Sequence, residues 1–145
     1  MSFIKCYAEH ADARLVALCD LKPELAAELA DEHGVEGAYT DLDRMLDEAN
    51  LDLLSVHTPD HLHAAPFVAG LEAGCHVFTE KPMGNSMDDL ARMIAAARAS
   101  DRKTAVGHIL RFNPVFAAVH RLCAAGELGE IFYLEADYIH NLLGQ

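Results

Sequence analysis

Clustered basic residues, closely spaced cysteine pairs and long apolar runs are missing from this 145-residue chain, and each absence excludes a class of protein. Its 11 Lys and Arg are scattered among 23 Asp and Glu, which argues against nucleic acid or an anionic membrane as a partner. The four cysteines form no C-x-x-C pair, as is typical of a reduced, cytoplasmic protein. No apolar run approaches the roughly 20 residues that span a bilayer, and residues 1–15 lack the apolar segment of a signal peptide. We therefore expect a cytoplasmic protein that binds neither nucleic acid nor a membrane.

What is present is an acidic chain with enough apolar residues for one globular core. Hydrophobic residues make up 52% of the sequence, too many for a disordered chain despite a formal net charge of −12. Continuously apolar runs alternate with amphipathic ones, which predicts an α/β fold with a doubly wound parallel sheet covered by helices on both faces. We expect strands at residues 13–20, 37–39, 51–56, 75–80 and 104–110, and helices at residues 23–34, 42–49, 61–74, 87–100 and 114–129.

Residues 130–141 differ from the earlier strand-like runs because their apolar and polar side chains alternate. Alternation is typical of an antiparallel strand with one face in water, so it indicates a new sheet. We expect one domain over residues 1–128 and the first strand of a second, α+β domain over residues 129–145.

Polar residues follow four of the expected strands, and in open parallel sheets ligands bind at the carboxyl ends of the strands. These residues are Asp20, Thr58-Pro59-Asp60, Glu80-Lys81-Pro82 and Arg111-Phe112-Asn113. A carboxylate at Asp20 is placed to accept hydrogen bonds from the ribose of a dinucleotide, or else it leads into the helix that begins at Pro23. Lys81 is held extended by the following proline, so its ammonium either projects over the sheet edge toward a ligand or is a solvated turn lysine.

Three histidines, His57, His61 and His63, raise the question of a metal site. His57 ends a strand whereas the other two begin a helix, and residues two apart on a helix do not share a face. Zinc requires three or four converging ligands, which no Cys or carboxylate spacing supplies here. We therefore expect no metal, and a histidine beside a nucleotide cofactor is the preferred interpretation.

The segments "LVALCD", "TPDHLH", "AGCHVFTEKPMG" and "RFNP" together resemble the Rossmann domain of the glucose-fructose oxidoreductase, inositol dehydrogenase and MocA-like (Gfo/Idh/MocA) family. The Glu-Lys-Pro triplet is its most specific mark. The resemblance implies an NAD(P)-dependent oxidoreductase that acts on secondary alcohols of sugars, cyclitols or related compounds and assembles as dimers or tetramers. It implies that Lys81 is catalytic, and that the cofactor is bound by Asp20, Thr58, Pro59, His63, Glu80 and Lys81. Asp20 favours NAD over NADP, although Lys22 nearby is suited to a 2′-phosphate.

Two parts of the family pattern are missing. The family opens with a strand and a G-x-G-x-x-G loop, whereas residues 1–15 look like the helix that follows that loop, and its second domain carries an acid-histidine pair that is not found here. We expect a fragment that binds its nucleotide weakly and has little activity alone, since two lost hydrogen bonds to the pyrophosphate cost about 3 to 6 kcal/mol. A non-catalytic α/β interaction module that has lost cofactor binding is the alternative.

The missing strand is the central one of the family's sheet. Its loss leaves the strands at residues 13–20 and 51–56 with open inner edges. We expect that these strands either close up against each other or are covered by a second chain.

Overall fold

The computed structural model describes residues 3–137 and 139. The chain divides into two compact units, Met1–Gly107 and His108–Gln145, which are described separately. No helix in the described residues is long and apolar enough to cross a membrane.

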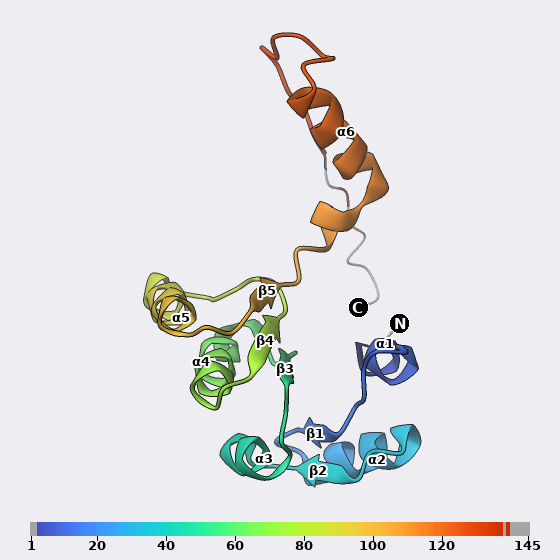
Figure 1. Cartoon of the computed structure of the whole chain (residues 1–145), viewed down its shortest axis with the longest axis vertical. Coiled ribbons are helices and arrows are strands. Elements are labelled where there is room, and N and C mark those ends of the chain that lie inside the picture. The colour runs from blue at the N-terminus through green and yellow to red at the C-terminus, as the bar shows by residue number, and fades with distance from the viewer. Residues whose placement is uncertain (1–2, 138, 140–145) are drawn as a thin grey trace. The chain divides into compact units, whose positions relative to one another are not determined.

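The first unit alternates helices and short strands in the predicted order (Figure 1). Its elements are α1 (Phe3–Glu9), β1 (Ala17–Cys19), α2 (Pro23–His33), β2 (Gly37–Tyr39), α3 (Leu42–Glu48), β3 (Leu53–Val56), the 3-10 turn η1 (Asp60–Leu62), α4 (Ala64–Glu72), β4 (His76–Thr79), α5 (Met87–Ala99) and β5 (Thr104–Val106).

The strands form two parallel sheets rather than one. β1 pairs with β2, and the other sheet has the order β3-β4-β5. The predicted α/β class with parallel, Rossmann-like strands is confirmed. Within the described residues β1 and β3 do not pair, so the first of the two expected outcomes, that these strands close up against each other, is not found. The second, that another chain covers their open edges, stays a prediction.

Local signals in the sequence set the helix ends. Pro23 opens α2, and Gly34 ends it with a left-handed φ of 65°, a conformation that costs glycine little. The Asp41 side chain accepts a hydrogen bond from the Arg44 amide at the start of α3. Ser86 does the same for the Asp89 amide at the start of α5.

The hydrophobic core lies between the three-stranded sheet and the helices α4 and α5. Phe67 of α4, Met93 of α5 and Val77 of β4 are almost completely buried. Helix α4 can approach strand β3 closely because α4 carries Gly70, where a Cβ would lie 2.7 Å from the Leu54 side chain. Met45 of α3 belongs to the same core cluster, so α3 joins this core.

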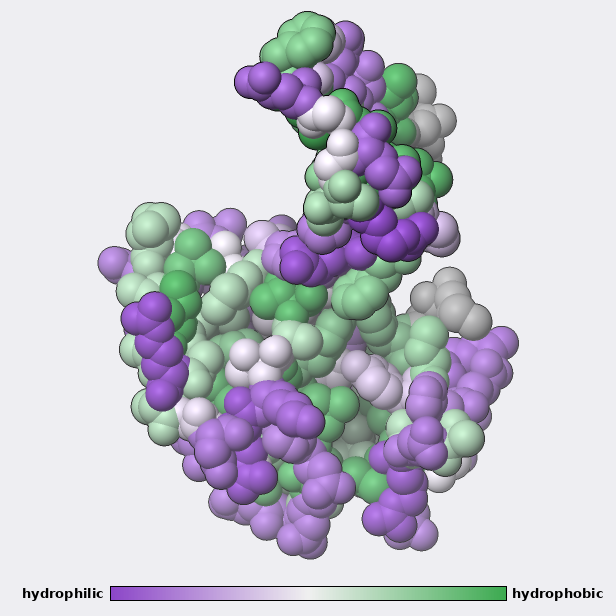
Figure 2. Space-filling model, turned by 45° about the horizontal axis from the view of Figure 1, so that its top comes forward, coloured by the Kyte–Doolittle hydropathy of each residue, from purple (hydrophilic) through white to green (hydrophobic). Residues whose placement is uncertain are grey.

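The second unit contains the 3-10 helix η2 (Ile109–Phe112) and α6 (Pro114–Ala124). Its α6 begins at the Asn113 cap, whose side chain accepts a hydrogen bond from the Val115 amide. Apolar side chains are exposed along α6, where green surface is visible in Figure 2: Val115, Phe116, Val119 and Leu122.

Two strand predictions at this end of the chain are corrected. The strand expected at 104–110 stops at Val106, because the chain turns into η2. The strand expected at 130–141 is not formed in its described residues, 130–137 and 139, while 138, 140 and 141 lie outside the described part. An alternating strand is stable only when another strand pairs with it, and no described segment does so. The predicted domain boundary near Gly129 stays a prediction.

Candidate functional site

The loops that follow β3 and β4 leave the same edge of the sheet. The two strands are parallel neighbours, with Val56 aligned with Thr79, and the Glu80 amide donates to the Val56 carbonyl at 3.0 Å. We call residues 57–60 and 80–82 the rim. The structure thus brings Thr58 and Pro59 to the same edge as Glu80 and Lys81, as the positions of the apolar runs predicted.

His63 connects the two halves of the rim. Its Nδ1 lies 2.7 Å from the Pro82 carbonyl oxygen and its Nε2 lies 2.9 Å from the Thr58 carbonyl oxygen. The residue is only 1% exposed. Both ring nitrogens therefore face backbone oxygens of the rim itself.

Glu80 is the most constrained carboxylate of the rim. Its Oε2 accepts a hydrogen bond from the Lys81 amide at 3.1 Å, whereas its Oε1 is buried and has no hydrogen-bond partner among the described residues. Gly107 packs directly against this carboxylate, since a Cβ at position 107 would lie 2.7 Å from Oε1. A buried acceptor without a donor is costly in a folded protein, which makes this oxygen unusual.

Lys81 is exposed, and within the described residues its ammonium makes no ion pair or hydrogen bond. The Lys81–Pro82 peptide bond is cis. An exposed ammonium without a partner among the described residues is suited to holding a hydroxyl group of a ligand.

Asp20 stands at the end of β1, in the other sheet, and no hydrogen bond of the described residues joins it to the rim. Its Oδ1 accepts the Lys22 amide at 2.8 Å, so the residue does lead into α2. The second oxygen, Oδ2, has no such partner in the described residues. Burial, followed by the charges of Asp41 and Asp20, raises the pKa of the neighbouring Cys19 thiol.

Arg111, Phe112 and Asn113 do not close a strand, contrary to their predicted position. The first two lie in η2, and Asn113 caps α6 in the second unit. Their predicted place followed from extending β5 to residue 110, and the real strand ends four residues earlier, at Val106.

Sequence reasoning missed Gly107 and a chain of side chains behind His57. The Tyr7 hydroxyl lies 2.8 Å from Ser55 Oγ, which lies 2.7 Å from His57 Nε2. The His57 ring also lies against Phe3, with ring centroids 4.2 Å apart. These contacts join α1 to β3 across about 50 residues of sequence, a separation at which periodicity carries no signal.

Burial is the main cause that lowers the pKa of His57 from its ordinary value of 6.5, while the Glu80 carboxylate acts in the opposite direction and raises it. A depressed pKa means that the unfolded chain binds more protons than the folded one between the two pKa values. The stability that His57 contributes is therefore fully present above about pH 6.5 and is lost as the pH falls through the folded pKa.

Two substitutions should move this pKa in opposite directions. We expect Phe3→Ala to raise the pKa of His57 toward 6.5, because it exposes the ring, and Glu80→Gln to lower it further, because it removes a negative charge. Titration of the His57 ring proton shifts by NMR measures both. A pKa that stays the same in both variants would contradict the observed packing of His57.

The described residues contain no group of three or more His, Cys, Asp or Glu that could hold a metal ion. The His57 ring packs against Phe3, His61 is exposed, and His63 lies between two carbonyl oxygens, so the three side chains have different surroundings.

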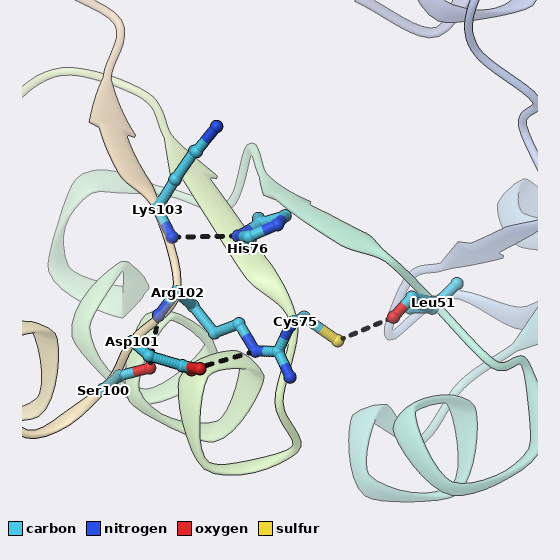
Figure 3. A network of polar contacts seen from close by, with 7 residues as sticks. All are labelled: Leu51, Cys75, His76, Ser100, Asp101, Arg102 and Lys103. Atoms are coloured by element: carbon cyan, nitrogen blue, oxygen red, sulfur yellow. Dashed lines mark hydrogen bonds and ion pairs between the residues drawn. The ribbon is translucent and has the colours of Figure 1, made fainter.

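The opposite edge of the sheet, where β4 and β5 begin, carries polar contacts of a structural kind (Figure 3). The Lys103 amide donates to His76 Nδ1 at 2.9 Å, and the Cys75 thiol donates to the Leu51 carbonyl at 3.3 Å. The proton of the neutral His76 ring therefore lies on Nε2. These contacts connect the strand starts to neighbouring segments.

Comparison with known proteins identifies the family of the chain. Residues 2–108 match the family described as "Oxidoreductase family, NAD-binding Rossmann fold" (GFO_IDH_MocA). A curated relative, 4-carboxy-2-hydroxymuconate-6-semialdehyde dehydrogenase of Sphingobium sp. strain SYK-6, is 33% identical over 114 residues, which are 79% of this chain and 36% of that protein.

Two solved structures share the fold at similar coverage. The WlbA dehydrogenase from Bordetella pertussis, in complex with NADH and UDP-GlcNAcA, has a TM-score of 0.83 and 32% identity over 89% of this chain and 37% of that one. The scyllo-inositol dehydrogenase from Lactobacillus casei, with bound NAD(H) and scyllo-inositol, has a TM-score of 0.81 and 26% identity over 88% of this chain and 38% of that one. The chain therefore spans little more than a third of the length of these relatives.

Proposed function

Because the chain belongs to the Gfo/Idh/MocA family of oxidoreductases, with its NAD-binding Rossmann fold, we propose that it is the nucleotide-binding part of an NAD(P)-dependent dehydrogenase. The reaction would transfer a hydride between nicotinamide and a secondary alcohol of a sugar, cyclitol or related compound. The observation that carries this proposal is the rim, where Lys81, whose ammonium has no hydrogen-bond or ion-pair partner among the described residues, directly follows Glu80, whose Oε1 is buried and unpaired. Two of the relatives bind a sugar nucleotide and an inositol together with NAD(H), which supports this class of substrate.

The described residues fit the two ends of a dinucleotide better than its middle. Asp20 would offer a carboxylate oxygen to a ribose, Thr58 and Pro59 would line the cofactor, and Glu80 would lie at the nicotinamide end. The described residues include no glycine-rich loop at a helix start to hold a pyrophosphate. For residues 1–145 by themselves we therefore expect millimolar rather than micromolar affinity for NAD.

Each residue would act through simple electrostatics. The Lys81 ammonium would donate to the oxygen of the substrate alcohol and stabilise the negative charge that develops there. Nicotinamide, when bound, supplies the hydride acceptor. The Asp20 carboxylate would accept hydrogen bonds from ribose hydroxyls and repel a 2′-phosphate, which favours NAD over NADP.

Cys19 offers a direct test because it is exposed and adjacent to Asp20. We expect NAD to slow alkylation of Cys19 in a saturable, millimolar-range manner, with NADP less effective, and to leave the exposed Cys123 of the second unit unchanged. Mass spectrometry of alkylated peptides measures both rates in one sample. Absence of protection by any nucleotide would instead favour the non-catalytic module.

Asp20→Asn is expected to weaken this protection about tenfold, since a hydrogen bond to a charged acceptor is lost. The substitution also removes one of the charges that raise the pKa of Cys19, so each variant is compared with its own rate without nucleotide. Asp31→Asn, which removes the same charge from the exposed side of α2, is the matched control. Equal protection in the two variants would exclude Asp20 as a nucleotide ligand.

A further inference from the structure

We propose that His63 is a positioning residue that fixes the Lys81 loop to the Thr58 loop. This inference rests on the proposed function for the role of Lys81, but the contact itself is independent of any cofactor. It differs from the expectation that His63 lines the cofactor, because its ring is buried and turned toward the backbone of the rim.

The two carbonyls that His63 contacts are short of other donors. Each lies in a loop that contains a proline, Pro59 or Pro82, and proline has no backbone N–H. Among the described residues no backbone amide donates to the Thr58 or the Pro82 oxygen. The imidazole is therefore the described group whose ring nitrogens lie within hydrogen-bond distance of both oxygens.

The number of N–H groups on the His63 ring determines how many of the two carbonyls it can hydrogen-bond. A neutral imidazole carries one N–H and donates to one of the two carbonyls, whereas an imidazolium donates to both. The two nitrogens lie 2.7 and 2.9 Å from the two oxygens, so the imidazolium hydrogen-bonds both loops, whereas the neutral ring hydrogen-bonds one loop and only packs against the other.

The ring is also held by a rigid element. His63 immediately precedes α4, and its own carbonyl accepts the amide of Phe67, a residue of the buried core. Thr58 and the Lys81–Pro82 peptide therefore both contact a residue that is fixed at the start of α4. A side chain that reacts with substrate needs such support, because small displacements of a catalytic group reduce its effect.

Hydrogen exchange tests the link without any cofactor. In the full chain, we expect His63→Phe to raise the exchange rates of the Lys81 and Met83 amides about tenfold, since hydrogen bonds to the rim are lost. The Val77 amide, which donates to the Lys103 carbonyl within the sheet, should keep its rate. His61→Phe is the matched control, because this neighbouring histidine is exposed, and it should leave all three rates unchanged.

A second substitution at position 63 shows whether hydrogen bonding by His63, and not only its volume, holds the two loops. His63→Gln restores a donor, and we expect it to return the Lys81 and Met83 rates toward those of the unsubstituted chain. Rates that remain unchanged in His63→Phe, or that are equally raised in His63→Gln, would overturn the proposal.

The unsubstituted protein gives a second test should His63→Phe fail to fold. A ring N–H of His63 that is protected from solvent exchange and shows nuclear Overhauser contacts to residues 59 and 83 is the expected result. A ring that exchanges freely would refute the link. Failure of NAD to protect Cys19 while the exchange results hold would refute the proposed function alone.

Discussion

Replacement of Phe67 by alanine is expected to lower the free energy of unfolding by about 3 to 5 kcal/mol. Phe67 is 1% exposed and belongs to the cluster that joins α4 to the sheet and to α5. The cost combines the lost burial of the ring with the cavity left behind, which the surrounding side chains fill only in part. Because domains are stable by only about 5 to 15 kcal/mol, this change should bring the chain close to unfolding.

Urea unfolding followed by far-ultraviolet circular dichroism measures this effect, since the chain has no tryptophan to report by fluorescence. Phe132→Ala is the matched control, because that ring is 96% exposed and its removal should change stability by less than about 0.5 kcal/mol. Similar losses in both variants would mean that Phe67 is not in the core.

The second large effect is expected at Gly37. A Cβ at this position would lie 2.8 Å from the Val16 carbonyl oxygen and 3.2 Å from the Ala17 Cβ, so a side chain meets the backbone of the neighbouring strand. The strand cannot move away without breaking the pairing of Ala17 with Gly37. We expect Gly37→Val to cost about 3 kcal/mol, near the upper end of what overpacking usually costs.

This substitution should also disturb the nucleotide site, because in the described residues β2 is the only strand that pairs with β1, which leads to Asp20. Urea unfolding gives the stability loss, and alkylation of Cys19 gives the local effect, expected as faster reaction. Ala38→Val adds the same kind of side chain at the next position of β2, where the residue is exposed, and should change neither quantity. A stable Gly37→Val variant with slow Cys19 alkylation would contradict the close approach of the two strands.

Local patterns in the sequence were sufficient for the class of fold and for most helix ends. Proline, glycine, aspartate and serine act on backbone groups within a few residues, so the bounds of α2, α3 and α5 followed from Pro23, Gly34, Asp41 and Ser86. The continuous apolar runs located β3 and β4, and with them the positions of Thr58 and Lys81. Alternation alone was misleading at residues 130–137, because a strand depends on a partner that its own sequence does not contain.

Tertiary structure decided what the predicted site residues touch. That His63 faces the carbonyls of Thr58 and Pro82, that Gly107 lies beneath Glu80, and that β1 and β3 belong to separate sheets are all consequences of chain segments meeting in space. The sequence by itself determined the elements and the residue types at their ends, since these depend on interactions within a few residues. The Pro82 partner of His63 lies 19 residues away in the chain, and a single sequence carries no local signal for packing between such distant segments.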